Sequence, residues 1–305
     1  MKAKVVVIIL IILLCKNNFA QNIDVNFPYA SAIENAEFDK AEKKIMNAYA
    51  KDSTDIMICY AAYRLYISKE SSIYDLEKAY SFLMRSTTGY NSLDDKEREK
   101  LTKKNLTKNV LKADMQKTVN LGLEVAIAVN TLDSYNHFLD FYSKGMTQYQ
   151  RIDACNGRNA LEFNEAKRIN TIESYQRFID LRPNSREIYE AELLRNELAY
   201  KQVEAENTIS AYESFVRKYP RAKETPHVKE ILYDLAYDEA KNLNTENSYR
   251  VYANKYPDSP YAKSAEEQAN SMQFARETKK GDWESYKNYI IEHTILIEMV
   301  LIFNL

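Results

Sequence analysis

The sequence predicts an all-α protein built from tandem pairs of antiparallel helices. Gly accounts for only 5 and Pro for only 6 of the 305 residues, against usual shares of about 7% and about 5%. Strand-rich folds need many turns made from these two residues, so their scarcity favours helices. A motif also recurs along the chain, with apolar residues at helical spacing. One helix pair buries too little apolar surface to fold alone, so we expect the pairs to stack into one elongated domain.

The first 20 residues have the order of a secretory signal peptide. A basic start at 1–4 precedes the aliphatic residues 5–14, and polar residues follow up to Ala20. This apolar run is too short to cross about 30 Å of hydrocarbon. We therefore expect export with cleavage after Ala20, and an uncleaved anchor is the alternative. Lipidation of Cys15 is disfavoured because Leu14 stands where a bacterial lipobox has a small residue.

Residues 21–84 are expected to form degenerate versions of the same helix pair. Segments that begin at Phe38 and Tyr74, 36 positions apart, each combine aromatic residues with a following Ala. Residues 56–67 lie between them, are rich in Tyr and Ala, and predict a first helix. Residues 85–108 then interrupt the array, and their many charged side chains predict a polar helix or linker.

Residues 109–290 carry the clearest repeats. A tyrosine recurs with steps of 40, 37, 37 and 37 residues, at Tyr135, Tyr175, Tyr212, Tyr249 and Tyr286. A second aromatic residue follows three positions later, at Phe138, Phe178, Phe215, Tyr252 and Tyr289. In three copies a proline follows eight positions after the tyrosine, at Pro183, Pro220 and Pro257. We expect the aromatic residues to lie in the core, as structural anchors of each repeat.

Each repeat predicts a short helix followed by a long one. The short helix is expected to begin at an Asn such as Asn170, whose side chain accepts an N–H of the first turn, and Glu173 completes a box-like cap. Pro183 is expected to end it, because the residue before a proline disfavours helical dihedral angles. The long helix is expected over residues 186–204, with a core stripe at Ala191, Leu194 and Leu198.

The pattern Tyr-x2-Phe-x4-Pro-x-Ser, followed by a long helix with aromatic residues and alanines, resembles the tetratricopeptide repeat. The Tyr-Pro pairs at 219–220 and 256–257 make it most similar to exported bacterial envelope proteins of the BamD and CpoB type. The resemblance implies a right-handed superhelical solenoid over 109–290, whose long helices line a concave groove. The period of 37 exceeds the family's about 34 residues, and the family's usual Gly in the first helix is absent.

No clustered catalytic or cofactor motif occurs in the sequence. The five glycines lie at least twelve positions apart, which excludes a P-loop and a dinucleotide-binding turn. His137, His227 and His293 are isolated and match no zinc motif. We therefore expect no enzyme activity, no cofactor and no metal. A net charge of −2 without a basic block argues against nucleic-acid binding. Cys59 and Cys155 are expected as buried thiols, with a single bridge between them as the alternative.

Long-helix positions expected to be exposed are candidates for contact with a protein or peptide partner, and an ordinary solvated face is the alternative. The family resemblance places such positions along the concave groove, and those selected are Arg195, Asn196, Lys229 and Asp234. The same interpretation makes the protein membrane-peripheral at most.

The C-terminal stretch 291–305 is apolar and lacks the pattern of a long helix, with Thr294 where a proline is expected. We expect a truncated repeat that covers the last groove or mediates self-association. The leading functional hypothesis is an exported, non-catalytic scaffold for protein–protein interaction in the periplasm or cell envelope. The alternatives are a glycan-associated envelope module and the regulatory or targeting part of a larger protein.

Overall fold

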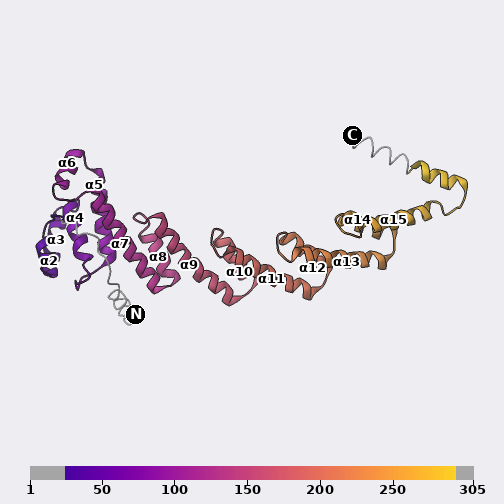
Figure 1. The fold of residues 1–305 in the computed structure, drawn as a ribbon, viewed down its shortest axis with the longest axis horizontal. Coiled ribbons are helices and arrows are strands. Elements are labelled where there is room, and N and C mark those ends of the chain that lie inside the picture. The colour runs from indigo at the N-terminus through magenta and orange to yellow at the C-terminus, as the bar shows by residue number, and fades with distance from the viewer. Residues whose placement is uncertain (1–24, 293–305) are drawn as a thin grey trace. The chain divides into compact units, whose positions relative to one another are not determined.

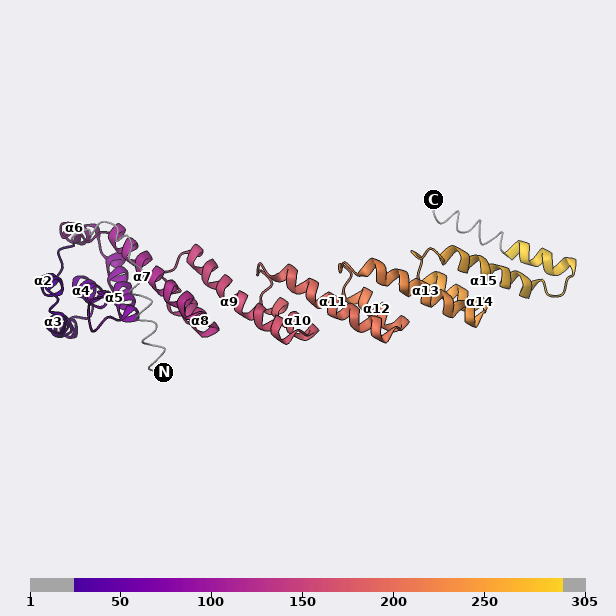
Figure 2. The same ribbon diagram turned by 60° about the horizontal axis from the view of Figure 1, so that its bottom comes forward.

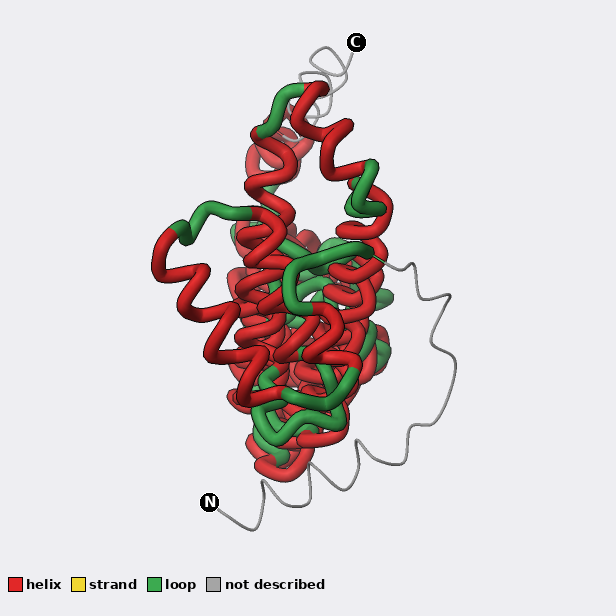
Figure 3. The backbone as a smooth tube through the Cα atoms, turned by 90° about the vertical axis from the view of Figure 1, so that its left-hand side faces the viewer, coloured by secondary structure: helices red, strands yellow, loops and turns green. Residues whose placement is uncertain are grey.

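The computed structural model describes residues 25–292, and every regular element in this part of the chain is a helix (Figure 1, Figure 3). The all-α prediction is therefore confirmed for the described residues. None of their helices combines the length and apolar character that a membrane span requires. The expected signal peptide, including Cys15, and all but the first two residues of the expected tail (291–305) lie outside the described range.

Residues 25–292 divide into two compact units, one with residues 25–168 and Asn184–Glu187, the other with Ile169–Pro183 and residues 188–292. The first unit contains α2 (Ala30–Glu34), α3 (Phe38–Lys51), α4 (Ile56–Tyr66), α5 (Leu76–Ser92), α6 (Asp95–Thr102), α7 (Lys108–Val129), α8 (Leu132–Phe141) and α9 (Gln148–Ile169). The second unit contains α10 (Ile172–Leu181), α11 (Ile188–Glu206), α12 (Ile209–Lys218), α13 (Thr225–Leu243), α14 (Glu246–Lys255) and α15 (Ala262–Glu277). A further helical segment of the second unit covers residues 283–292.

Helix α4 forms the centre of the first unit, with nine of its 11 residues buried. It packs between α3 and α5 and also contacts α2. Gly89 allows α5 to approach closely, since a methyl group added there would lie 2.8 Å from Cγ1 of Ile56. The helix predicted over 56–67 is thus found as α4.

The expected boundary after residue 84 falls inside α5, which continues to Ser92. The helix persists because its buried positions, which include Leu83, Ser86 and Tyr90, continue at helical spacing past that point. The polar segment that follows forms α6, in which no residue is buried. Asp94 caps α6 by accepting the N–H of Glu97 at 2.8 Å.

The second unit repeats one helix pair, a short helix followed by a long one (Figure 1). Each of α10, α12 and α14 has 10 residues. The most extensive contacts of α12 and α14 are with the long helix that follows, and smaller ones are with the long helix before (Figure 2). Among the described residues of this unit, all extensive helix contacts join elements that are consecutive in the chain.

The length of the long helix explains the irregular first step of the repeat. Helix α9 has 22 residues, whereas α11 and α13 each have 19. The difference of three residues equals the difference between the first step of 40 and the later steps of 37.

The caps of the short helices differ from the prediction. Threonine, not asparagine, is the N-cap: Thr171 accepts the N–H of Ser174 at 3.1 Å, and the Ser174 hydroxyl accepts the N–H of Thr171. The prediction that Asn170 and Glu173 form the cap is therefore wrong. The same threonine–serine box closes α8 and α14, and Thr208 caps α12 alone.

The asparagine of each repeat ends the long helix instead. Asn130, Asn170, Asn207 and Asn244 have φ between 46° and 54°, the left-handed conformation that asparagine tolerates better than most residues. The side chain then accepts a hydrogen bond from the tyrosine hydroxyl five positions later. This bond measures 3.3, 3.0 and 3.1 Å in the first three copies. One residue therefore ends one helix and anchors the next.

The short helices end before the prolines, as predicted. Arg182, Tyr219 and Tyr256 are their C-cap residues, with φ between −132° and −126° and ψ between 53° and 61°. These angles lie outside the helical region, which the residue before a proline disfavours. Pro183, Pro220 and Pro257 are exposed.

The predicted core stripe of α11 is only partly correct. Ala191 is fully buried, but Leu194 and Leu198 are half-buried. Asn196 and Ala199 are buried in their place. Small side chains at these positions leave room for the aromatic anchors of the neighbouring short helices.

The aromatic anchors of the first four repeats have at most 6% of their surface exposed; they are Tyr135, Phe138, Tyr175, Phe178, Tyr212, Phe215, Tyr249 and Tyr252. The fifth repeat differs. Tyr286 is 39% exposed and Tyr289 is half-buried. Both rings contact Phe274 of α15, at 6.2 and 5.0 Å between centroids, but no further long helix covers them within residues 25–292.

Candidate functional site

A groove of about 880 Å³ crosses α5 in the first unit. The start of α4 and the loop before it form one wall, and the C-terminal end of α8 with the residues after it forms the other. A smaller cleft of about 340 Å³ adjoins it and shares Ser81, Arg85 and Phe141. The shared residues make the two hollows one continuous surface along α5.

Helix α5 is amphipathic, and polar side chains on its exposed side line this groove. Ala79, Leu83 and Ser86 are buried, and the Ser86 hydroxyl donates to the Ile56 carbonyl at 3.1 Å, which ties α5 to α4. The opposite side of the helix is left exposed, with Ser81 and Arg85 among the residues that line the groove.

The groove carries charges of both signs. The Arg85 guanidinium lies 5.9 Å from the ring centroid of Tyr49, and Lys144 and Asp140 stand on the α8 side. Phe141 contributes an apolar surface between the charged groups. Charged, hydroxyl and aromatic groups on an open surface suit contact with a polypeptide segment better than enclosure of a small molecule.

The apolar floor of the groove is inert. Burial raises the pKa of the Cys59 thiol to about 11, and the Sγ donates to the Ser53 carbonyl at 3.7 Å. A thiol with so high a pKa is neutral near pH 7 and is a poor nucleophile. Tyr80 packs against Phe141 and Tyr142, with centroids 5.5 and 4.7 Å apart. These residues therefore shape the groove and do not suggest covalent chemistry.

A polar cluster lies inside the first unit, between α4 and α7. The Tyr60 hydroxyl donates to Oδ2 of Asp114 at 2.8 Å, and Thr118 is fully buried beside it on α7. Burial raises the pKa of Asp114, while the hydrogen bond from Tyr60 and the positive charge of Arg64 oppose the shift. Arg64 also lies 5.4 Å from the ring of Phe27. Sequence reasoning missed this cluster, because its members lie 54 positions apart.

Of the predicted partner-contact residues, Arg195 and Asn196 serve the packing of the second unit. The expectation that Asn196 is exposed is wrong, since only 7% of its surface is accessible. Its Oδ1 accepts hydrogen bonds from Nε and Nη2 of Arg195 at 3.1 and 2.8 Å. Arg195 also donates to Gln176 of α10 at 2.8 Å and lies 4.9 Å from the ring of Tyr219. It thereby connects three consecutive elements.

The other two candidates lie on α13. Asp234 is exposed and its Oδ1 accepts the hydroxyl of Tyr261, at the start of α15, at 2.7 Å. Lys229 is half-buried. The structure therefore does not gather the four predicted residues into one recognisable pocket, and the groove on α5 was not foreseen from the sequence.

The remaining reactive residues are dispersed. Within residues 25–292 no group of three or more His, Cys, Asp or Glu side chains could hold a metal ion. Cys59 and Cys155 are both free thiols, so the alternative of a bridge between them is excluded. Cys59 is buried as expected, whereas the same expectation is wrong for Cys155, which is only half-buried. His137 lies beside the groove, with its Nε2 2.8 Å from Oε1 of Glu77 and its ring stacked on Phe141. His227 lies 3.5 Å from Glu230.

Comparison of the sequence with models of known protein families finds no match. Comparisons with curated proteins and with solved structures also find none.

Proposed function

We propose that the protein is an exported, non-catalytic scaffold that binds other proteins in the bacterial periplasm or cell envelope. Its helix pairs would form a right-handed superhelical solenoid of the tetratricopeptide type. The observation that carries the proposal is that the recurring residues have structural roles. Tyrosine, phenylalanine, asparagine and threonine recur with the repeat, and they serve as helix caps, helix ends and buried anchors. Such residues build a surface and leave recognition to the positions between them.

The groove on α5 is the proposed contact site. Its open shape and mixed charges fit a polypeptide segment. The decisive test is affinity capture from envelope extracts with the unmodified chain, Arg85→Glu and a control, Lys112→Glu. Lys112 is exposed on α7, does not line the groove, and undergoes the same change of charge. The proposal expects a protein that is retained by the unmodified chain and by Lys112→Glu but lost by at least about tenfold with Arg85→Glu. Equal retention by all three chains would contradict it.

Export is tested separately by fusing residues 1–24 to a reporter enzyme that is active only outside the cytoplasm. The proposal expects activity with the unmodified leader. It expects loss of activity when charged residues interrupt the aliphatic run 5–14. Reporter activity that is absent with the unmodified leader would contradict export and would leave the binding test unaffected.

A further inference from the structure

The side of helix α5 that lines the groove presents a row of hydrogen-bond donors. Its members follow one another at steps of three, four, three and four positions, so they share one side of the helix. We call them the donor row, and they are Lys78, Ser81, Arg85, Thr88 and Ser92. None of the five carries a carboxylate. The row covers about 21 Å of helix at about 1.5 Å per residue, a length that an extended segment of about six residues matches at about 3.3 Å per residue.

Arg85 is the central member of the donor row, and it lines both the groove and the adjoining cleft. Its side chain is exposed, and its guanidinium lies 5.9 Å from the ring centroid of Tyr49. The Tyr49 ring packs edge-on against Phe82, with centroids 5.2 Å apart. These contacts hold the guanidinium over the aromatic ring, but within residues 25–292 it donates to no acceptor. Its N–H groups are therefore available to a partner that enters the groove.

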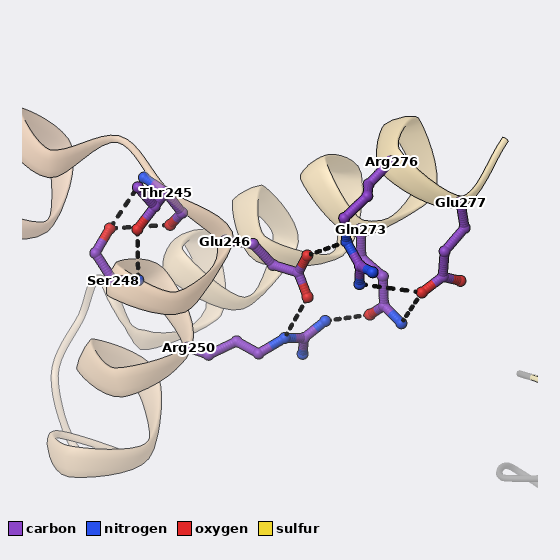
Figure 4. A network of polar contacts seen from close by, with 7 residues as sticks. All are labelled: Thr245, Glu246, Ser248, Arg250, Gln273, Arg276 and Glu277. Atoms are coloured by element: carbon purple, nitrogen blue, oxygen red, sulfur yellow. Dashed lines mark hydrogen bonds and ion pairs between the residues drawn. The ribbon is translucent and has the colours of Figure 1, made fainter. Parts of the chain in front are cut away.

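The contact between α14 and α15 shows how this chain satisfies arginines that lie between two helices (Figure 4). Arg250 of α14 donates to Glu246 at 3.2 Å and also to Gln273 of α15. Arg276 of α15 donates to Glu246 at 3.1 Å. Both guanidinium groups therefore have a carboxylate acceptor in the chain itself. Arg85 has none among the described residues, which leaves the acceptor for a partner to supply.

The carboxylates beside the donor row are already engaged with other groups. Asp75 caps α5 by accepting the N–H of Lys78 at 2.9 Å, and its Oδ2 lies 3.6 Å from the Lys78 ammonium. Oε1 of Glu77 lies 2.8 Å from Nε2 of His137. Neither carboxylate forms an ion pair with Arg85. The positive charge of Arg85 is therefore not compensated on this side of the groove.

The α8 wall of the groove adds one charged group of each sign. Asp140 and Lys144 are exposed and four positions apart, and neither forms an ion pair within the described part of the chain. Phe141 lines both the groove and the adjoining cleft with its ring. Together with Arg85, the surface presents two uncompensated positive groups, one negative group and an aromatic ring.

We propose that the groove on α5 binds a polypeptide segment that places one Asp or Glu carboxylate on Arg85 and an apolar side chain on Phe141. A carboxylate accepts two parallel N–H bonds from a guanidinium, and such charge-assisted bonds are about twice as strong as neutral ones. Asp140 repels a second acidic group at the α8 wall, so a uniformly acidic chain fits less well. The inference rests on the proposed scaffold function and names the chemistry of its partner.

The probe is a phage-displayed library of random peptides of about ten residues, longer than the segment of about six residues that the donor row spans. Selection on the full chain is expected to enrich sequences that share one Asp or Glu beside an apolar residue. Synthetic peptides with these sequences are then titrated into the unmodified chain, Arg85→Gln and Lys112→Gln. The affinity is expected to fall by at least about tenfold with Arg85→Gln. It is expected to be retained with Lys112→Gln, the exposed α7 control outside the groove.

A double-mutant cycle tests the contact itself. Changing the shared peptide carboxylate to its amide is expected to weaken binding to the unmodified chain by at least about tenfold. The same change is expected to weaken binding to Arg85→Gln by less than about twofold, because both changes remove the same ion pair. An equal loss in both chains would overturn the proposal. Enriched sequences that share no acid, enriched sequences that are uniformly acidic, and the absence of any enriched sequence would each overturn it as well.

These outcomes are distinguishable from failure of the scaffold function. The capture experiment asks only whether an envelope protein is lost with Arg85→Glu, whatever the chemistry of that protein. An Arg85-dependent protein together with a failed double-mutant cycle would overturn the carboxylate contact and leave the scaffold function in place. Equal capture by all chains would remove the scaffold function at this groove even where a selected peptide binds through Arg85.

Discussion

The first unit contains contacts between helices that are not consecutive, such as α5 with α7 and α2 with α4, whereas the extensive contacts within the second unit join consecutive helices. The first unit also holds a half-buried charged cluster around Asp114 and brings glycines against large side chains, as with Gly157 and Tyr135. The second unit repeats a threonine cap and a pair of buried aromatic anchors in each of its helices α10, α12 and α14. The same kind of helix pair is therefore packed irregularly in the first unit and as a regular array in the second.

This difference in helix contacts predicts that the two units unfold with different cooperativity. In an array with nearest-neighbour contacts, each pair is stabilised only by the pairs beside it, and damage stays local. In a body with non-consecutive contacts, several helices depend on the same core residues.

The largest expected difference between the two units is in how far damage spreads when one buried aromatic anchor is lost. Phe138→Ala and Phe215→Ala each remove a fully buried ring, and each is expected to cost about 3–5 kcal/mol of local stability. Limited proteolysis with fragment mapping is expected to show cleavage throughout the first unit for Phe138→Ala. For Phe215→Ala, new cleavage is expected only in α11, α12 and α13. Cleavage confined to one helix pair in both variants would remove the contrast.

The polar cluster around Asp114 gives the next largest expected loss of stability. Asp114→Ala removes the acceptor of the Tyr60 hydroxyl and the negative charge that attracts the Arg64 guanidinium, and is expected to lower the unfolding free energy of the first unit by about 1–3 kcal/mol. Urea unfolding followed by fragment-resolved hydrogen exchange measures this. The second unit is expected to be unchanged, and an equal loss in both units would show that they unfold together.

Asp114 also predicts a pH effect of known sign. Burial raises its pKa in the folded state above the ordinary value of 3.8, so the folded state favours the protonated form. Its contribution to stability is fully present below pH about 3.8 and is lost as the pH rises through the raised pKa. Asp114→Asn is therefore expected to make the first unit less sensitive to pH above that value. An unchanged pH profile would contradict the assignment of the raised pKa to Asp114.

The left-handed asparagines predict a moderate effect in the second unit. Asn207→Ala puts a residue that tolerates the left-handed conformation less well than asparagine at φ 46° and removes the acceptor of Tyr212, at an expected cost of about 1–2 kcal/mol. Asn207→Gly restores the backbone freedom and loses only the hydrogen bond, so a smaller loss is expected. Gly281 already occupies the equivalent position, with φ 67°. Thermal unfolding of both variants checks the order, and an equal loss would assign the whole effect to the hydrogen bond.

Surface ion pairs are expected to matter least. Lys201→Ala removes a 2.7 Å contact with Glu197 in which both side chains are largely exposed, and less than about 0.5 kcal/mol is expected. Denaturant unfolding in low and high salt provides the measurement. A loss above about 1 kcal/mol would show that α11 depends on its surface charges.

The repeats made the helix pairs predictable, because an aromatic spacing sustained over several copies reflects burial. The cap assignment failed because Asn and Thr are adjacent and both are good N-caps; only the dihedral angles separate their roles. Asn196 was expected to be exposed because the tetratricopeptide resemblance places such long-helix positions along the concave groove, whereas Arg195 satisfies its amide inside the fold. The groove on α5 combines residues from α4, α5 and α8, and no local pattern encodes such a juxtaposition.

The use of the recurring residues as one structural device in every repeat is best tested by residue-resolved amide hydrogen exchange on the unmodified chain. It predicts strong protection of the amides of Asn130, Asn207 and Asn244, which donate to helix carbonyls at 2.8–3.0 Å, and of Ser134, Ser174 and Ser248, which donate to the capping threonines. Exchange of these amides at unprotected rates in two or more repeats would contradict it.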